Sequence, residues 1–435
     1  MRKKKNEKTG SVSRRDFIRT SAAVGMGALL SGTGAVFAQR PKKLRIALIG
    51  CGGRGKGAVS NCLEAGKHIG LDLEVIATSD WFKDRAEGAG KEFNVPPSRC
   101  FDGADGYKKL LETNADVVLM ATPPSFRPVH FEAAIKAGKH VFIEKPVAVD
   151  PPGVRRVIEA GELAKQKNLA VVAGTQRRHQ ASYLRNAYAV HHGAIGDIKG
   201  GCVWWCGRVP WIHPRESSDT NADYLVRNWL NFYELSGDHI VEQHVHNLDV
   251  ANWFIGHPPI KAVGFGGRAR RKTGNQFDFF SIQYDYADDL HIHSMCRQIS
   301  GCYNLVSEHF VGSEGSTWGE GKMQTEKKID IPDFPEHGGP QVQEHVDLLN
   351  SILEDKPLNE ARNVAESTLT AIMGRISAYT GQVIMWSDLI EKKDSQWYNL
   401  QLAPTAEDFE KGQVVAPPDD VIPIPGEEDK RFKNP

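Results

Sequence analysis

Residues 44–55 read LRIALIGCGGRG, and this stretch decides the fold class. Its first six residues are apolar apart from one arginine, a pattern typical of a strand buried in a parallel sheet. The G-x-G-x-x-G turn that follows lets a backbone approach a pyrophosphate, and the next helix would offer free N–H groups and the positive end of its dipole. The stretch therefore predicts a Rossmann domain that binds a dinucleotide. The residues predicted to contact it are Gly50, Gly52, Gly53, Arg54 and Gly55.

An acidic residue follows the second predicted strand, residues 73–77, at Asp80. A carboxylate there can accept hydrogen bonds from both ribose hydroxyls of adenosine and would repel a 2′-phosphate. The spacing from the glycine turn is longer than usual, and residues 68–72 look like an inserted turn that accounts for it. We therefore predict NAD as the cofactor, with NADP less favoured. A glycine turn that serves packing alone is the competing interpretation.

Three further predicted strands end in polar or proline-containing segments. Ligands of open α/β sheets bind at the carboxyl ends of the strands, so these segments should face the cofactor. The additional cofactor contacts predicted on this ground are Thr122, Pro123, Glu144, Lys145 and Gln176.

Together these segments resemble the Gfo/Idh/MocA oxidoreductases, the superfamily of glucose–fructose oxidoreductase and inositol dehydrogenase. The most specific match is the block AGKHVFIEKP at 137–146. The other matching segments are 50–55, 121–124 (ATPP), 174–178 (GTQRR), 193–198 (GAIGDI) and 246–249 (HNLD), with Trp253 four residues on. The resemblance covers nearly all residues after 38. It implies an α/β protein with an amino-terminal Rossmann domain and a second α/β domain, whose open, mostly antiparallel sheet carries the substrate site and usually an oligomer interface.

The resemblance also implies catalytic residues. Oxidation of an alcohol needs a base for the hydroxyl proton, and in the family the lysine of Glu-Lys-Pro lies by the nicotinamide, which makes Lys145 the first candidate. The family's second pair is an Asp and a His four residues later; here Glu242 stands at the Asp position, and His246 matches the histidine. His244 replaces a glycine between them. For these three residues, a packed helix turn with satisfied polar groups is the alternative.

Aromatic residues gather between positions 204 and 233, with charged and amide side chains among them. Such rings suit sugars, whose C–H faces stack on them while the hydroxyls hydrogen-bond, although a core or an oligomer interface would also explain the density. The predicted substrate contacts are Arg178, His179, Trp205 and Asp249, and a structural ion pair is the alternative for Arg178.

The spacing of Glu242, His246, Asp249 and Trp253 predicts one stripe of an α-helix. His239, Glu242 and His246 also have helical spacing, which raises the question of a metal site. No His-Glu-x-x-His order exists and no outside ligand is identifiable, so no metal site is predicted.

Residues 1–38 have the layout of a twin-arginine export signal. Arg14 and Arg15 precede an apolar Gly/Ala run and a cleavage-compatible Val-Phe-Ala at 36–38. We expect recognition by the twin-arginine (Tat) export machinery, a periplasmic location, and no membrane span after signal removal. The remaining chain is divided into a Rossmann domain (39–170), a substrate and oligomerisation domain (171–402) and a Pro- and acid-rich tail (403–435).

The charge balance argues against nucleic acid as a partner. The chain has 54 basic and 54 acidic side chains, but residues 1–38 hold eight of the basic ones and two of the acidic ones. The rest of the chain is therefore mildly acidic, whereas phosphate binding needs concentrated Lys and Arg.

These observations predict an exported NAD-dependent oxidoreductase acting on a CH–OH group of a sugar, polyol or glycoside, as a homodimer or homotetramer. Outside the cytoplasm there should be no free NAD pool, so the cofactor should be held tightly and its hydride returned within the cycle or passed to a second substrate. One alternative is an NAD-dependent glycoside hydrolase or lyase that oxidises the sugar transiently, although the active-site signature of such enzymes is not recognisable here. A catalytically silent sugar- or nucleotide-binding protein is the third.

Overall fold

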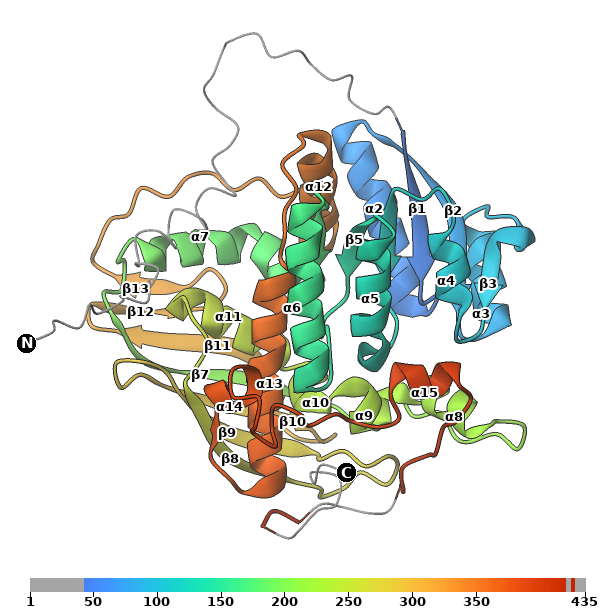
Figure 1. Ribbon diagram of the computed structural model, residues 1–435. Coiled ribbons are helices and arrows are strands. Elements are labelled where there is room, and N and C mark those ends of the chain that lie inside the picture. The colour runs from blue at the N-terminus through green and yellow to red at the C-terminus, as the bar shows by residue number, and fades with distance from the viewer. Residues whose placement is uncertain (1–42, 420–423, 427–435) are drawn as a thin grey trace, which may run out of the picture.

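The computed structural model of the protein describes residues 43–419 and 424–426, which form two sheets flanked by helices (Figure 1). The first sheet has the strand order β3-β2-β1-β4-β5-β6, and the second has the order β13-β12-β11-β7-β10-β9-β8-β14. The predicted fold class, a Rossmann domain followed by an α/β domain with an open and mostly antiparallel sheet, is confirmed. The predicted export signal lies outside the described residues.

The first sheet is built from short, apolar, parallel strands. They are β1 (Lys43–Ile49), β2 (Asp72–Asp80), β3 (Cys100–Asp102), β4 (Val117–Met120), β5 (His140–Ile143) and β6 (Val171–Ala173). Every residue of β4 is buried, because helices cover both faces of the sheet. These helices are α2 (Gly53–Ile69), α3 (Lys83–Glu92), α4 (Gly106–Leu111), α5 (Arg127–Lys136) and α6 (Pro151–Gln166).

The first core contains residues from both halves of the chain. β6 is the edge strand of the first sheet, so this sheet extends past the predicted domain boundary at residue 170. Helix α12 (Pro340–Leu353) comes from the second half and packs against α2. Its Val346 and Leu349 are buried in the same apolar cluster as Leu44 and Leu48 of β1.

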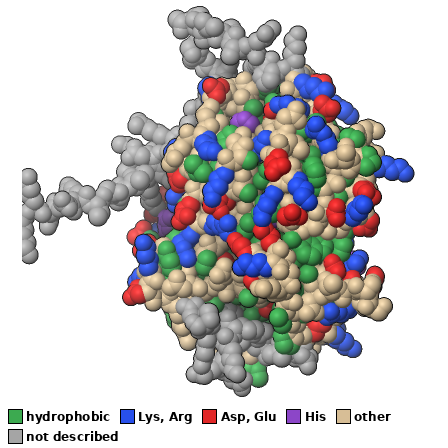
Figure 2. All heavy atoms as spheres, turned by 45° about the vertical axis from the view of Figure 1, so that its right-hand side comes forward, with side chains coloured by type: hydrophobic (Ala, Val, Ile, Leu, Met, Phe, Trp, Pro, Cys, Tyr) green, Lys and Arg blue, Asp and Glu red, His purple; other side chains and the backbone are tan. Residues whose placement is uncertain are grey.

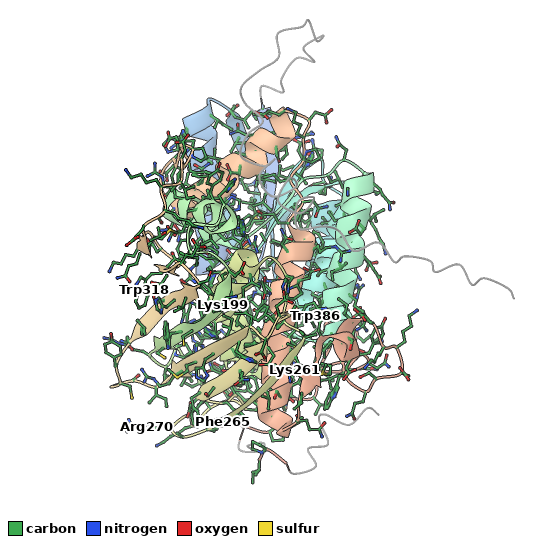
Figure 3. All side chains as sticks on the ribbon, turned by 90° about the vertical axis from the view of Figure 1, so that its left-hand side faces the viewer. Lys199, Lys261, Phe265, Arg270, Trp318 and Trp386 are labelled. Carbon is green, nitrogen blue, oxygen red and sulfur yellow. The ribbon has the colours of Figure 1, made fainter. Side chains whose placement is uncertain are left out.

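The second sheet pairs its strands antiparallel except where β7 meets β10. Its strands are β7 (Ile198–Gly207), β8 (Lys261–Gly267), β9 (Phe279–Asp285), β10 (His291–Gln298), β11 (Leu305–Gly312), β12 (Gly315–Trp318), β13 (Met323–Thr325) and β14 (Ile384–Met385). Helices α11 (Val245–Ile255) and α13 (Ala361–Thr380) pack on one face. The opposite face is open, and Figure 3 looks onto it, with Phe265 and Trp318 labelled on its strands.

The remaining helices and turns of the described residues are mostly short. The helices are α7 (Ala181–His191), α8 (Asn221–Arg227), α9 (Tyr233–Ser236), α10 (His239–Glu242), α14 (Trp386–Ile390) and α15 (Ala406–Glu410). The 3₁₀ turns are η1 (Pro97–Arg99), η2 (Pro124–Phe126), η3 (Gln176–His179) and η4 (Trp229–Asn231). Within residues 43–419 and 424–426, the structure has no helix with the length and apolar run that a membrane crossing requires.

The continuous helical stripe predicted from Glu242 to Trp253 is wrong at one point. Glu242 ends α10, whereas His246 lies in α11, and residues 243–244 between them form a turn. Packing accounts for the break: the ring of His244, in the turn between the two helices, is buried and bonds Ser294 Oγ of the second sheet at 2.7 Å.

Charges of both signs are interspersed over the surface of the Rossmann half (Figure 2).

Candidate active site

The glycines of the turn after β1 divide into two kinds. Gly50 has φ +92°, and a Cβ there would lie 2.6 Å from the carbonyl carbon of Ala121. A Cβ on Gly55 would lie 1.8 Å from the carbonyl oxygen of Gly50, so both positions need glycine for the turn itself. A Cβ on Gly52 or Gly53 would meet no atom within 4 Å. The turn is therefore closed by its first and last glycines and open on the side where a phosphate can approach.

Asp80 lies directly against this turn, at the end of β2. One carboxylate oxygen accepts a hydrogen bond from the Cys51 N–H at 2.7 Å, and the other accepts one from the Phe82 N–H at 3.0 Å. Burial raises the pKa of Asp80, and these two backbone bonds oppose the rise. The carboxylate thus holds the glycine turn in place and also forms part of the wall of the cavity beside it.

A cavity open to solvent, with about 640 Å³ of empty space including its mouth, lies at the carboxyl ends of β1, β2 and β4. Most of its lining comes from the Rossmann half, including five of the predicted cofactor contacts and neighbours: Gly50, Gly52, Asp80, Thr122 and Pro123. Aromatic side chains form another part of the wall: Trp81, Tyr107, Phe126 and His130. Val226 and Trp229 close it from the second half. This position is the one at which open α/β sheets bind nucleotides.

Arg127, which the sequence analysis missed, joins two loops at this edge. Its Nε donates to the Thr122 carbonyl at 2.8 Å and its Nη1 to the Pro146 carbonyl at 2.6 Å. Burial lowers the pKa of Arg127 to about 10, which leaves it charged at neutral pH. No sequence signal marks it, because an arginine at the start of a helix is ordinarily a surface residue.

Lys145 and Glu242, predicted as catalytic from distant parts of the sequence, meet in the structure. The Lys145 Nζ donates to the Glu242 carbonyl oxygen at 2.5 Å and lies 3.3 Å from Glu242 Oε1. Their side chains are only 10% and 9% exposed. The pair therefore places an amine and a carboxylate in a nearly water-free position between the two domains.

His246 begins α11 and lies flat against Trp205, with ring centroids 5.6 Å apart and an angle of 20° between the rings. Its ring nitrogens have no hydrogen-bond partner among the described residues. Burial lowers the pKa of His246 well below its usual value, and the charges of Lys145, Arg177 and Arg54 lower it further. The ring is therefore neutral at neutral pH and can accept a proton.

Arg54 connects the glycine turn to the loop that carries Glu144 and Lys145. Its Nε bonds Glu144 Oε1, and its Nη2 bonds Glu344 Oε1 at 3.1 Å. The second oxygen of Glu144 accepts from the Lys145 N–H at 3.2 Å, which orients that loop. Burial raises the pKa of Glu344 well above its usual value, and the negative charge of Glu144 adds to the rise. Glu344, on α12, was not found from the sequence.

Three of the predicted substrate contacts have charged partners within the protein. Arg178 bonds Asp249 through Nε–Oδ2 and Nη2–Oδ1, each at 2.9 Å, which is the ion pair considered as the alternative for Arg178. His179 lies between Asp347 at 2.6 Å and Glu360 at 3.4 Å. Burial opposes the charge of His179, but these carboxylates raise its pKa well above the usual value. The fourth predicted substrate contact, Trp205, is uncharged, and its ring lies beside His246. Gln176, a predicted cofactor contact, is half-buried on η3.

Arg177, for which the sequence analysis predicted no role, lies in a buried network of polar side chains. Its guanidinium bonds Glu308, and Glu308 also accepts from Asn247 Nδ2 at 2.6 Å and from the Tyr183 hydroxyl at 3.1 Å. The same guanidinium lies 5.9 Å from the centre of the Trp205 ring. This buried network joins Glu308 of β11 and Asn247 of α11 to Arg177, which lies next to Trp205, the ring packed against His246. Two adjacent arginines in a motif give no signal as to which one turns inward.

Two of the three residues considered for a metal, His239 and Glu242, have other partners. His239 Nε2 lies 3.2 Å from the Trp205 carbonyl oxygen, and burial lowers the pKa of His239 to about 3. Glu242 bonds Lys145. In the part of the chain that the structure describes, no three His, Cys, Asp or Glu side chains are arranged to hold a metal ion.

Comparisons with known proteins place this geometry in context. Among curated relatives, a glycosyl hydrolase family 109 protein of Streptomyces coelicolor is 28% identical over 220 residues, which are 44% of this chain and 44% of the relative. An inositol 2-dehydrogenase of Klebsiella pneumoniae is 32% identical over 217 residues, 49% of this chain and 54% of the relative. The chain spans about half the length of the curated relatives it matches.

Solved structures share the fold. A levoglucosan dehydrogenase in complex with NADH and levoglucosan aligns with a TM-score of 0.63 at 17% identity, over 79% of this chain and 99% of that one. An aldose–aldose oxidoreductase of Caulobacter crescentus complexed with glycerol aligns with a TM-score of 0.60 at 16% identity, again over 79% and 99%. At these identities the likeness concerns the fold alone.

The family model that matches is described as "Oxidoreductase family, NAD-binding Rossmann fold", and it covers residues 44–175. The match begins with β1 and ends just after β6, so it takes in the whole first sheet and the glycine turn. Residues 44–175, less than a third of the chain, are thus similar in sequence to the NAD-binding Rossmann domain of the Gfo/Idh/MocA oxidoreductases.

Proposed function

We propose that the protein is an NAD-dependent oxidoreductase that transfers a hydride between a CH–OH group of a sugar, polyol or glycoside and a tightly held nicotinamide cofactor. The observation that carries the proposal is the contact between Lys145 and Glu242 at the carboxyl edge of the sheet that bears the dinucleotide-type cavity. His246 lies close enough for the positive charge of Lys145 to lower its pKa. The names of the relatives, an inositol 2-dehydrogenase and a levoglucosan dehydrogenase with NADH, support this substrate class.

The side chains around Lys145 fit this reaction. Oxidation of a CH–OH group releases a hydride from carbon and a proton from oxygen, and a bound nicotinamide supplies the hydride acceptor. The Lys145 amine, held by Glu242, and the neutral ring of His246 can both bond the reacting hydroxyl, and these two groups are the candidates to accept its proton. Trp205 beside His246 offers a flat apolar surface for the C–H face of a sugar.

Asp80 supports NAD over NADP as the cofactor. Its carboxylate lines the cavity next to the glycine turn, where the adenosine ribose would bind. A 2′-phosphate at that position would meet a second negative charge in a partly buried setting, which is costly. Asp80→Ser should therefore weaken NAD binding and reduce the ratio of the affinity for NAD to the affinity for NADP.

The protein is proposed to be exported by the twin-arginine route, on the basis of residues 1–38. In that setting a closed catalytic cycle avoids dependence on a free coenzyme pool. A second candidate follows from the same reasoning: a redox-neutral glycosidase in which the sugar is oxidised transiently. The similarity to a glycosyl hydrolase family 109 protein favours this candidate specifically.

The protein is also proposed to assemble as a homo-oligomer through the open face of the second sheet. Phe265, Met295 and Val263 are 63%, 39% and 38% exposed. Phe265 and Val263 lie on β8 and Met295 lies on β10, the two strands on either side of β9. Apolar side chains in such an arrangement typically mark an association surface.

The decisive experiment is to purify the protein from the periplasm, denature it, and identify and count any released dinucleotide. Near-stoichiometric NAD(H) is the expected result. The loaded enzyme would then be screened with sugar pairs and aryl glycosides. Absorbance change at 340 nm or product formation from a second sugar indicates net hydride transfer, whereas aglycone release without net change indicates the glycosidase. If the purified protein contains no dinucleotide and binds added NAD only weakly, the proposal that the cofactor is held tightly is wrong.

A further inference from the structure

The carboxyl-terminal segment after residue 402 packs across the Rossmann half. Thr405 caps α15 with its side-chain oxygen, and Asp408 returns a bond to the Thr405 N–H at 2.8 Å, so the turn of helix has its own start signal. In Figure 1 this helix, in red, lies below α5 and beside α8, far from the strands that precede it in sequence.

Two consecutive residues of α15 anchor this segment to the cavity wall. The ring of Phe409, which is 2% exposed, meets Trp81 edge-on at 5.6 Å and Phe126 edge-on at 4.9 Å. Glu410 Oε1 accepts a hydrogen bond from the Tyr107 hydroxyl at 2.9 Å. The Tyr107 ring in turn lies 4.1 Å from the ring of His130.

The residues that α15 contacts are the aromatic wall of the dinucleotide-type cavity. Trp81, Tyr107 and Phe126 all line it, on the side next to Asp80 where the adenosine half would bind. Phe409 itself does not line the cavity; it packs against Trp81 and Phe126, which do. Trp81 is fixed from a second direction as well, because its Nε1 donates to Asp223 Oδ1 of α8 at 2.8 Å.

We propose that Phe409 and Glu410 are positioning residues for the adenosine half of the cofactor, and that α15 slows release of the dinucleotide by holding the aromatic wall closed. The proposal rests on the proposed function, since it needs a dinucleotide in this cavity. Without the Phe409 ring, Trp81 and Phe126 border a void and can move into it, which loosens the wall. A wall that holds its shape without the ligand lowers the ordering cost of binding.

The test measures how fast the full-length protein, loaded with NADH, releases it when mixed with excess NAD, followed by the fluorescence of bound NADH. Phe409→Ala should release NADH about tenfold faster than wild type, equivalent to about 1.4 kcal/mol. Phe409→Leu, which fills much of the same space, should restore most of the slow release. Turnover at saturating dinucleotide should be unchanged, because the segment does not touch Lys145 or His246.

The matched control is Val415→Ala, on the same segment but 78% exposed, which should release NADH at the wild-type rate. Tyr107→Phe, which keeps the ring and removes only the hydroxyl bonded to Glu410, covers the case in which Phe409→Ala does not fold, and should release NADH several-fold faster. Wild-type rates in both Phe409→Ala and Tyr107→Phe would refute the role of the segment and leave the proposed function standing. A wild-type chain that binds no NADH would refute the proposed function and this inference together.

Discussion

At the scale of single residues, the candidate site depends on a lysine that is held by one partner. Lys145 Nζ bonds both the carbonyl and the carboxylate of Glu242, and its loop is oriented by Glu144, which Arg54 anchors. The amine therefore has a defined position before substrate arrives, which is the condition for efficient proton transfer.

Lys145→Ala should lower kcat by about 10²- to 10⁴-fold, the usual contribution of a positioned acid or base. NADH binding should stay within a few-fold of wild type, because the glycine turn and Asp80 are untouched. Steady-state turnover and NADH fluorescence titration measure the two quantities separately. Lys165→Ala, on the exposed face of α6, is the control. Turnover that survives in Lys145→Ala would assign the proton transfer to His246 alone.

At the scale of elements, α12 is the helix that makes the two halves depend on each other. It lies against α2 and contributes Val342, Val346, Leu348 and Leu349 to the core of the first sheet. It also carries Glu344, the partner of Arg54. The Rossmann sheet is thus completed by a helix about 165 residues further along the chain than the end of the matched family domain.

Leu349→Ala should lower the free energy of unfolding by about 2–5 kcal/mol, since its side chain is fully buried and the truncation leaves a cavity. Leu353→Ala, on the same helix but only partly buried, should cost clearly less. Urea unfolding followed by tryptophan fluorescence gives both values. Equal effects of the two substitutions would contradict the placement of α12 in the first core.

At the scale of the whole molecule, buried neutral histidines link stability to pH. Burial lowers the pKa of His130, His239 and His345 to about 3, and the ring of His345 lies 4.3 Å from Phe142 with no hydrogen-bond partner for either nitrogen in the described structure. In the unfolded chain the pKa of each is near 6.5, so below that pH the unfolded state binds protons that the native state does not. Stability from these groups is therefore present above pH 6.5 and lost as the pH falls.

The expected loss is about 1.4 kcal/mol per pH unit for each such histidine below pH 6.5. His179 acts in the opposite direction, because its pKa is raised, and it stabilises the native state more as the pH falls toward 6.5. His345→Phe, which keeps a ring on Phe142, should flatten the dependence of the urea midpoint between pH 6.5 and 5. His257→Gln, at an exposed position, should not. An unchanged slope in His345→Phe would show that this ring is protonated in the native state.

The proposed association through the second sheet gives another prediction at this scale. Phe265→Asp puts a charge at the most exposed apolar side chain of β8 and should shift the protein to monomer, because a buried unpaired carboxylate opposes association. Light scattering after size-exclusion chromatography measures the mass. Val415→Asp on the exposed tail is the control. A monomeric wild-type protein would contradict the proposed oligomer. An oligomeric Phe265→Asp variant would contradict this face as its interface.

The sequence by itself determined the local elements of the Rossmann half. The apolar run before Gly50, the glycine turn and the polar strand ends are short-range patterns, and the period of side chains along a buried strand makes them readable without tertiary contacts. The same holds for Lys145, whose position at a strand end places it at the ligand edge of the sheet.

The tertiary structure alone decided which polar side chains are available. Arg178 and Asp249 were both predicted to meet substrate, but they lie 71 residues apart and bond each other. Arg127, Arg177, Glu344 and Phe409 went unnoticed because their roles come from partners far along the chain. A sequence shows that a residue can carry charge or bury a ring; which partner satisfies it depends on long-range packing, since buried polar groups must be paired wherever the fold brings them together.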